Sequence, residues 1–470
     1  MTPRPKLAII GLDCAPPELV FDRLAHHMPF VSSLMDRGVH GPMHSTEPPI
    51  TVPAWSAMMT SLDPGQLGFY GFRNRSAYDY NSLAIATSRA VKEARLWDYL
   101  GQAGLKSIVL NVPQTYPPSP INGLMVSGFL APDTDSQFTF PRGLKLRLDE
   151  FCQGEYIIDA RNFRTHNKDR LAREINLMTT RRFNLARTLI SQEEWDFFMM
   201  VEMGPDRMHH GFWRFFDPEH RFYKPGNAYE KVIPDYYARL DREIASLVKA
   251  MPADTLIMIV SDHGVQPMQG GFLINEWLCR KGWLSLKKPV TEPGPLKPEM
   301  VDWQNTLAWA EGGYYSRIFL NLMDREPQGA LAPGKKDIFC LKLSQELEAL
   351  KGPDQKPLNN RVLNPADSYV ELKGLPPDLI LYPGDLAWRA LSTVGTGCLF
   401  SFENDTGPDD ANHAPWGIFM AAPKQGSLKT ENPLPKDLSL YDVAPTALNW
   451  MGQKIPSKMT GRVLFLEKTN

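Results

Sequence analysis

Three short apolar runs in the chain are each followed by an aspartate. They are residues 6–12 before Asp13, residues 195–201 before Asp206, and residues 256–261 before Asp262. Continuous apolar runs of this length are typical of strands buried on both faces, as in a parallel sheet covered by helices. In such sheets the functional crevice lies beyond the carboxyl ends of the strands. We therefore expect Asp13, Asp206 and Asp262 to share one site.

Amphipathic segments alternate with these runs. Residues 229–250 carry apolar positions at three- and four-residue steps, which predicts a helix, and residues 174–192 are predicted to form another. Pro234 must lie in the first turn of its helix or kink it. Residues 107–112 and 417–422 are further candidate strands, and residues 438–451 a closing helix. This order predicts an α/β fold with a mostly parallel central sheet and helices on both faces.

The amino-acid composition of the chain changes after residue 264. Residues 284–312 and 326–366 are rich in proline, lysine and glycine, while residues 316–322 between them alternate like a strand of a surface sheet. We therefore predict an inserted cap subdomain at residues 266–400. The catalytic core would then comprise residues 1–265 and 401–470.

Composition excludes several classes of protein. The net charge of −2 over 470 residues argues against binding a nucleic-acid polymer through bulk electrostatics. No apolar run approaches the ~20 residues of a membrane span, and the apolar run near the start is too short for a signal peptide. The five cysteines are scattered and odd in number, which favours a reduced, cytoplasmic protein.

Histidines accompany the predicted cluster of aspartates. His210 lies four residues after Asp206, so the two share a face of a helical turn, and His263 directly follows Asp262. His413 lies in a predicted loop before a strand. Three carboxylates and three imidazoles suffice for two divalent transition metals. The alternative, in which each aspartate only caps a following helix, stays open for any single aspartate but is disfavoured for all six residues together.

Thr51 is the candidate nucleophile. Prolines at positions 48, 49 and 53 flank it at the entry to a predicted helix over residues 54–61. A hydroxyl at a helix start faces free backbone N–H groups, which favour an attacking oxygen and an anionic substrate, and a metal can lower its pKa. The alternatives are that Thr51 merely caps the helix, or that Ser56 is the reactive hydroxyl. Ser56 falls inside the helix and is expected to point elsewhere.

In this order, several motifs resemble those of the alkaline phosphatase superfamily, and most closely its type I phosphodiesterase/nucleotide pyrophosphatase branch. They are Gly11-Leu-Asp13, Pro49-Ile-Thr51-Val-Pro-Ala-Trp55, Asp206-x-x-x-His210, Ser261-Asp-His-Gly264 and the late His413. The resemblance implies an alkaline-phosphatase-like sandwich with two metal ions, usually zinc, with manganese as the alternative.

The resemblance also implies how the ligands are divided. Asp206, His210 and His413 would hold one ion, and Asp13, Asp262 and His263 would hold the other, with Thr51 bridging to it as nucleophile. In the family an asparagine some twenty residues after the nucleophile steadies the phosphoryl oxygen. Here Asn74 or Arg73 could fill that role, and a solvated basic loop is the alternative. An arginine would suit a dianionic monoester and an asparagine a diester.

The sequence thus predicts a bimetal phosphoric ester hydrolase of the phosphodiesterase/nucleotide pyrophosphatase type, working through a phospho-threonine at Thr51. Its substrate would be a small-molecule phosphate ester or pyrophosphate. A phosphomutase, phosphotransferase or phosphomonoesterase of the same superfamily is the first alternative. A metal-binding regulatory protein without turnover is the second, and the full set of ligand residues argues against it.

Overall fold

An eight-stranded sheet forms the centre of the protein in the computed structural model, which describes residues 6–428 and 433–465. Its strand order is β2-β21-β9-β1-β8-β5-β6-β7. The bounds are β1 Lys6–Leu12, β2 Val39–His44, β5 Ser107–Leu110, β6 Gly123–Val126, β7 Thr139–Phe140, β8 Phe197–Glu202, β9 Thr255–Val260 and β21 Trp416–Pro423. All five apolar runs predicted as strands therefore lie in this sheet.

Five neighbouring strands of the sheet, from β9 through β1, β8 and β5 to β6, run parallel. The antiparallel strands β21, β2 and β7 lie at the two edges. β8 and β9 are buried along their full lengths, because their apolar side chains are covered on both faces. The prediction of a mostly parallel sheet is confirmed.

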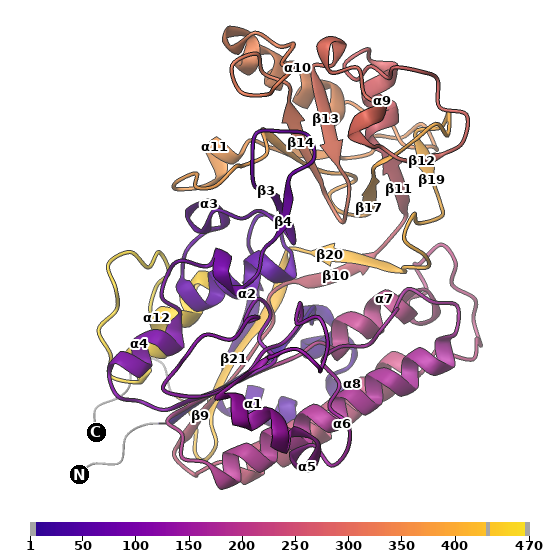
Figure 1. Cartoon of the computed structure of the whole chain (residues 1–470). Coiled ribbons are helices and arrows are strands. Elements are labelled where there is room, and N and C mark those ends of the chain that lie inside the picture. The colour runs from indigo at the N-terminus through magenta and orange to yellow at the C-terminus, as the bar shows by residue number, and fades with distance from the viewer. Residues whose placement is uncertain (1–5, 429–432, 466–470) are drawn as a thin grey trace.

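Helices cover both faces of this sheet (Figure 1). One group packs together as α1 Pro29–Arg37, α6 Lys168–Gln192, α7 Gly204–Phe216 and α8 Val232–Ala250. The other consists of α2 Thr51–Thr60, α4 Leu96–Gln102 and α12 Val443–Trp450. The short helix α3 Pro64–Leu67 packs next to α2, and the short helix α5 Leu148–Phe151 packs next to α6.

The predicted helix boundaries shift by a few residues. α6 begins at Lys168, six residues earlier than predicted, because the Asn167 side chain accepts a hydrogen bond from the Arg170 N–H and caps the helix. α8 begins at Val232, which places Pro234 in the first turn as expected. The closing helix α12 starts at Val443, after a 3-10 turn that Ser439 caps.

A second hydrophobic cluster lies apart from the sheet, in the upper part of Figure 1. The elements between residues 270 and 401, several of which form this cluster, are β11 Gly270–Leu273, α9 Ile274–Arg280, β12 Gly294–Pro295, β13 Ala308–Glu311, β14 Ser316–Leu320, α10 Lys336–Glu348, β15 Arg361–Leu363, α11 Pro365–Ser368, β16 Leu379–Tyr382, β17 Trp388–Leu391, β18 Thr393–Val394 and β19 Phe400–Ser401. The cap with its boundaries at 266 and 400 stays a prediction. The expectation of a surface strand was wrong, because every residue of β14 is buried within this cluster.

Two pairs of strands lie between the two parts of the molecule (Figure 1). β10 Gly264–Pro267 pairs antiparallel with β20 Ala411–Ala414, so that Val265 stands opposite His413. The predicted loop around His413 is therefore wrong, because pairing with β10 makes it a strand. β3 Arg73–Arg75 and β4 Leu83–Ile85 form a hairpin. Within the described residues, no helix is long and apolar enough to cross a membrane.

Candidate metal centre and active site

The three aspartates of the predicted cluster follow three adjacent strands of the sheet, β9, β1 and β8. Asp13 comes directly after β1, Asp262 comes two residues after β9, and Asp206 lies in the first turn of α7, which follows β8. All three are at most 2% exposed. Because the strands are parallel, their carboxyl ends meet at one edge and bring these carboxylates together.

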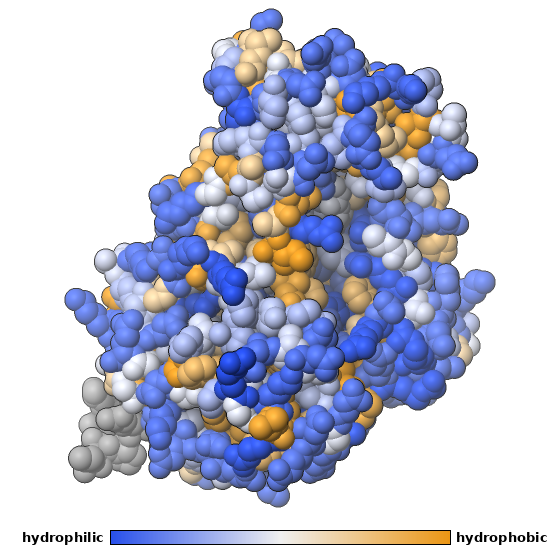
Figure 2. Space-filling model, viewed as in Figure 1, coloured by the Kyte–Doolittle hydropathy of each residue, from blue (hydrophilic) through white to orange (hydrophobic). Residues whose placement is uncertain are grey.

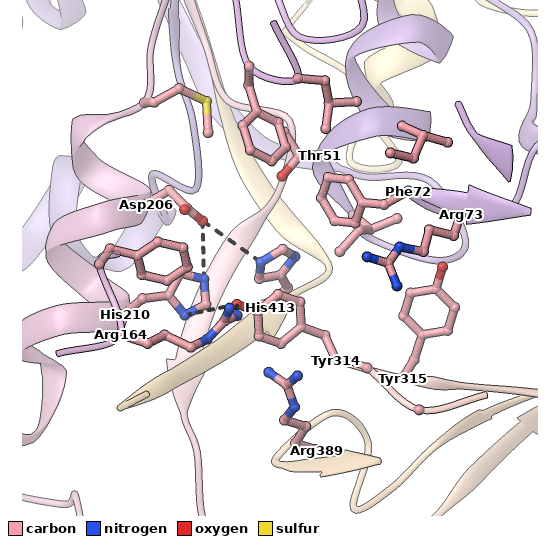
Figure 3. A pocket seen from close by; sticks show the side chains of 18 of the residues that line it. Thr51, Phe72, Arg73, Arg164, Asp206, His210, Tyr314, Tyr315, Arg389 and His413 are labelled. Atoms are coloured by element: carbon pink, nitrogen blue, oxygen red, sulfur yellow. Dashed lines mark hydrogen bonds and ion pairs between the residues drawn. The ribbon is translucent and has the colours of Figure 1, made fainter. Parts of the chain in front are cut away.

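Two compact groups of ligating atoms form at this edge, each with its atoms within 4.8 Å of one another. One contains Asp206, His263 and His413, and the other Asp13, Asp262 and His263. His210 stands beside the first group, with its Nε2 3.2 Å from Asp206 Oδ1 (Figure 3). The structure therefore brings all six predicted ligands together, with His263 between the two groups.

All three histidines turn the same ring nitrogen toward the carboxylates. In each, Nδ1 is engaged elsewhere: with Asp409 Oδ1 at 2.7 Å for His210, with the Gly264 carbonyl at 3.0 Å for His263, and with the Pro49 carbonyl at 3.0 Å for His413. A carbonyl or carboxylate at Nδ1 fixes the tautomer with the proton there. In the neutral imidazole, Nε2 then presents a lone pair, as in histidines that bind metals in proteins.

Each of the three carboxylates has one oxygen held and one oxygen free of hydrogen bonds. The donors are Trp55 Nε1 to Asp13 Oδ2 at 2.7 Å, Cys14 N to Asp262 Oδ1 at 3.2 Å, and Arg207 to Asp206 Oδ2. The other oxygens have no hydrogen-bond partner within the described part of the chain. A buried carboxylate oxygen without a partner is costly, and a divalent cation would provide that partner. The residues therefore fit a pair of metal ions.

The acid–base properties of the cluster follow from its burial. Burial raises the pKa values of Asp13 and Asp262, and a neighbouring carboxylate raises each further. Burial would also raise the pKa of Asp206, but the charges of His210 and Arg207 outweigh this and hold that pKa well below its usual range. The protein thus keeps one carboxylate ionised beside two that favour protons until a cation replaces them.

The pKa values of the three histidines are also shifted in different directions. Burial lowers the pKa of His263 to about 4 and also lowers that of His413. Burial opposes the charged form of His210 too, but the carboxylates of Asp409 and Asp206 raise its pKa to about 9. His263 and His413 are therefore held as neutral imidazoles, the form that binds a metal.

Thr51 is the first residue of α2, preceded by Ile50 in an extended conformation. The helix thus begins three residues earlier than predicted, and Thr51 is not its N-cap: no side chain caps this helix. The Thr51 hydroxyl lies 3.3 Å from His263 Nε2 and is 3% exposed. Ser56 instead donates to the side chain of Gln114, away from the aspartates, as expected.

A cavity of about 440 Å³ opens in front of Thr51, Asp206, His210 and His413. Figure 2 shows a hollow between the lower and upper parts of the molecule with hydrophobic residues on its rim. The wall combines aromatic and guanidinium groups, including those of Phe72, Phe129, Phe163, Arg73, Arg164 and Arg389. Such a space, apolar with a few charged groups, is typical of a site for a small molecule.

Arg73 and Asn74 take different places at this cavity. Arg73 lines it and is exposed, and its guanidinium points inward (Figure 3). Asn74 is not part of the wall. Its Oδ1 accepts from the Tyr70 N–H at 2.7 Å and its Nδ2 donates to the Gly71 carbonyl at 2.9 Å, so its amide closes the turn that precedes β3. Arg73 thus faces the site, whereas Asn74 supports the backbone that presents it.

Sequence reasoning missed two partners of the histidines. Asp409, from an acidic stretch at residues 403–410, holds the Nδ1 of His210. Tyr314, from the connection between β13 and β14, stacks on both His210 and His413. The run of acidic residues could have pointed to Asp409 from the sequence, whereas no local sequence pattern distinguishes Tyr314.

Comparison with protein families identifies the chain. Residues 7–407 match the model of the family described as type I phosphodiesterase / nucleotide pyrophosphatase. The match includes Thr51 but ends before Asp409 and His413, so the family model does not cover these two residues. A comparison with curated proteins gave no match. The chain belongs to the type I phosphodiesterase/nucleotide pyrophosphatase family.

Proposed function

We propose that this protein hydrolyses small phosphodiesters or pyrophosphates through a phospho-threonine at Thr51, with two divalent metal ions as cofactors. Family membership supports a phosphodiesterase or pyrophosphatase type of hydrolase. The observation that carries the finer proposal is the position of the Thr51 hydroxyl. It lies at a helix start, 3.3 Å from His263 Nε2, beside buried carboxylate oxygens that lack partners.

The ligands divide into two sets of three in this proposal. Asp206, His210 and His413 would hold one ion, and Asp13, Asp262 and His263 would hold the other. The three imidazoles favour zinc, with manganese as the alternative. When bound, the ions supply positive charge for the phosphoryl oxygens and lower the pKa of a nearby hydroxyl.

The chain itself supplies the nucleophile and the orientation. Thr51 Oγ1 attacks phosphorus while the bond from phosphorus to the leaving-group oxygen breaks, and that oxygen keeps the electron pair. The threonine proton passes to solvent and the leaving oxygen takes one up. Water then attacks the phospho-threonine and releases a proton to solvent, while the threonine oxygen leaves with the electron pair and takes up a proton. Free N–H groups at the start of α2 favour the anionic group in both steps.

Arg73 binds the substrate in this proposal. Its guanidinium faces the cavity and can donate two parallel hydrogen bonds to phosphoryl oxygens or to a second phosphate of a pyrophosphate. The aromatic side chains of Phe72 and Phe129 line the same cavity and can contact the leaving group. The cavity of about 440 Å³ suits a small molecule.

A substrate panel combined with a trapping experiment tests the proposal. Aryl phosphate monoesters, diesters and phosphonates are assayed with zinc and with manganese, and acceptor alcohols are added to separate transfer from hydrolysis. The reaction is quenched in acid, and the peptide carrying Thr51 is examined by mass spectrometry. We expect diester turnover that needs metal, and one phosphoryl adduct on Thr51, which still carries the second ester group when the substrate is a diester. Turnover in the presence of chelator, or a label on another residue, contradicts the proposal.

A further inference from the structure

The ring of Tyr314 covers two of the proposed metal ligands. It is stacked on His413 with ring centroids 4.4 Å apart and on His210 at 5.0 Å, with interplanar angles of 30° and 21°. Figure 3 shows the ring beside both imidazoles. Tyr314 lies between β13 and β14, in the segment predicted to be an inserted cap. The inserted segment therefore limits how far either imidazole can rotate.

The hydroxyl of Tyr314 belongs to the network that fixes His210. It donates to Asp409 Oδ2 at 3.3 Å and accepts a hydrogen bond from Arg164. Arg164 Nε in turn donates to the same carboxylate oxygen at 2.8 Å. Asp409 Oδ1 remains for His210 Nδ1 at 2.7 Å. Tyr314 and Arg164 thus hold the carboxylate that sets the tautomer and orientation of His210.

The backbone of Tyr314 is connected to His413 as well. The Asn412 side chain donates to the Tyr314 carbonyl at 2.9 Å and to the Leu386 carbonyl at 2.7 Å, and its oxygen accepts the His413 N–H at 2.8 Å. One asparagine therefore joins β20 to two points of the inserted segment. His413 is held by this segment through its ring and through its main chain.

The other ligand set has different support. Asp13, Asp262 and His263 find their hydrogen-bond partners in Trp55, in the Cys14 N–H and in the Gly264 carbonyl. These partners lie within residues 1–265, and among the described residues none of the side-chain hydrogen bonds of this set reaches residues 266–400. The set of Asp13, Asp262 and His263 thus has its hydrogen-bond partners outside the inserted segment. The other set also has partners there, in Arg207, Asp409 and the Pro49 carbonyl, but it is contacted in addition by Tyr314 of the inserted segment.

We infer that Tyr314 is a positioning residue that makes the metal held by Asp206, His210 and His413 depend on the inserted segment, while the second metal does not. This inference rests on the two-metal function proposed above. Groups that orient a ligand typically change metal affinity by about 10- to 100-fold when they are removed. Only one of the two bound ions should respond to changes at Tyr314.

Metal titration of the full chain tests this inference. Zinc is added to chelated protein in competition with a chromophoric chelator, for the wild type and for Tyr314→Phe and Tyr314→Ala. The phenylalanine keeps the stacking and loses the hydroxyl, so its effect should be the smaller one. The alanine should weaken one equivalent of zinc about 10- to 100-fold and leave the other unchanged. If the alanine variant does not fold, the titration of Tyr314→Phe alone tests the inference, and one equivalent of zinc should still bind more weakly than in the wild type.

Tyr315→Phe is the matched control. It removes the hydroxyl of the next residue on the same connection, which donates to the Tyr70 carbonyl and touches no proposed ligand. It should lower stability and leave both zinc affinities as in the wild type. Equal weakening of both equivalents in the Tyr314 variants, or no change in either, overturns the inference. Fewer than two equivalents in the wild type overturns the two-metal function itself, and the inference with it.

Discussion

Asp409 Oδ1 accepts a hydrogen bond from His210 Nδ1 at 2.7 Å, although the two residues are 199 positions apart in the chain. The charge of His210 holds the pKa of Asp409 below its usual range, against the effect of burial, so this carboxylate stays ionised. An ionised partner strengthens the hydrogen bond and fixes Nε2 toward Asp206. Asp409 thus orients a residue of the candidate metal centre without being one of the proposed ligands.

Asp409→Asn tests this role. The amide keeps the shape but loses the charge, so we expect the affinity for one zinc equivalent to fall about 10- to 100-fold, measured by competition titration. Asp405→Asn is the control, because Asp405 Oδ1 lies 3.7 Å from Arg389 Nε and, among the described residues, Asp405 has no ion pair with a histidine. An unchanged affinity in Asp409→Asn would show that the hydrogen bond only stabilises the fold.

Thr51→Ala removes the proposed nucleophile. We expect kcat to fall by at least about 10³-fold, as when a covalent route is lost, while metal content and the melting temperature stay near those of the wild type. Thr51→Ser keeps a hydroxyl and should retain much of the rate. Ser56→Ala should keep its activity, because the Ser56 hydroxyl is bonded to Gln114. If Ser56→Ala were the inactive variant, the wrong hydroxyl would have been chosen.

Arg73→Ala should weaken substrate binding. A hydrogen bond to a charged group contributes about 1.5–3 kcal/mol, so kcat/KM should fall by roughly 10- to 100-fold. Asn74→Ala should act indirectly, since its amide closes the turn over Tyr70 and Gly71. We expect it to reduce thermal stability and activity together. Steady-state kinetics on a monoester and a diester check both expectations. If Asn74→Ala remained stable and lost only diester cleavage, Asn74 would contact the substrate directly, against this expectation.

Gly11→Ala should disturb the support of Asp13. An added Cβ would lie 2.3 Å from Trp55 Cη2 and 2.9 Å from Val201 Cγ2, so the indole would have to move. Trp55 Nε1 donates to Asp13, and moving the ring weakens this bond. Overpacking of this kind costs about 1–3 kcal/mol in the free energy of unfolding, measurable by denaturant titration. Gly294→Ala is the control, because nothing lies within 4 Å of its Cβ position.

Removal of metal should destabilise the folded protein. An ion that binds only the native state adds about 4 kcal/mol when its concentration is 1,000 times the Kd. We expect chelation to lower the melting temperature and zinc to restore it. In Asp262→Asn, zinc should raise the melting temperature less than in the wild type, because an amide takes the place of the carboxylate whose oxygen lacks a partner. A melting temperature that does not respond to chelator in the wild type would contradict a metal centre at this edge of the sheet.

The sheet and the convergence of the aspartates could be predicted from the sequence because both follow from local apolar runs. The strand at His413 could not, because β20 has only four residues and exists through its pairing with β10. The position of Asn74 depends on hydrogen bonds within its own turn. The contacts of Tyr314 join segments about 100 residues apart, and no periodicity in a single sequence reports such contacts.

The position of β20 and β21 late in the chain sets the order in which the centre can be assembled during synthesis. A growing chain that has reached residue 265 already carries Asp13, Asp206, Asp262 and His263, with β9 still lacking its partner β21. His413 is added only after the whole second hydrophobic cluster has been translated. One ligand set is thus complete while the chain is still growing, and the other waits for the last strand pair. The ligands of one proposed ion are therefore all synthesised about 150 residues before the ligands of the other are complete.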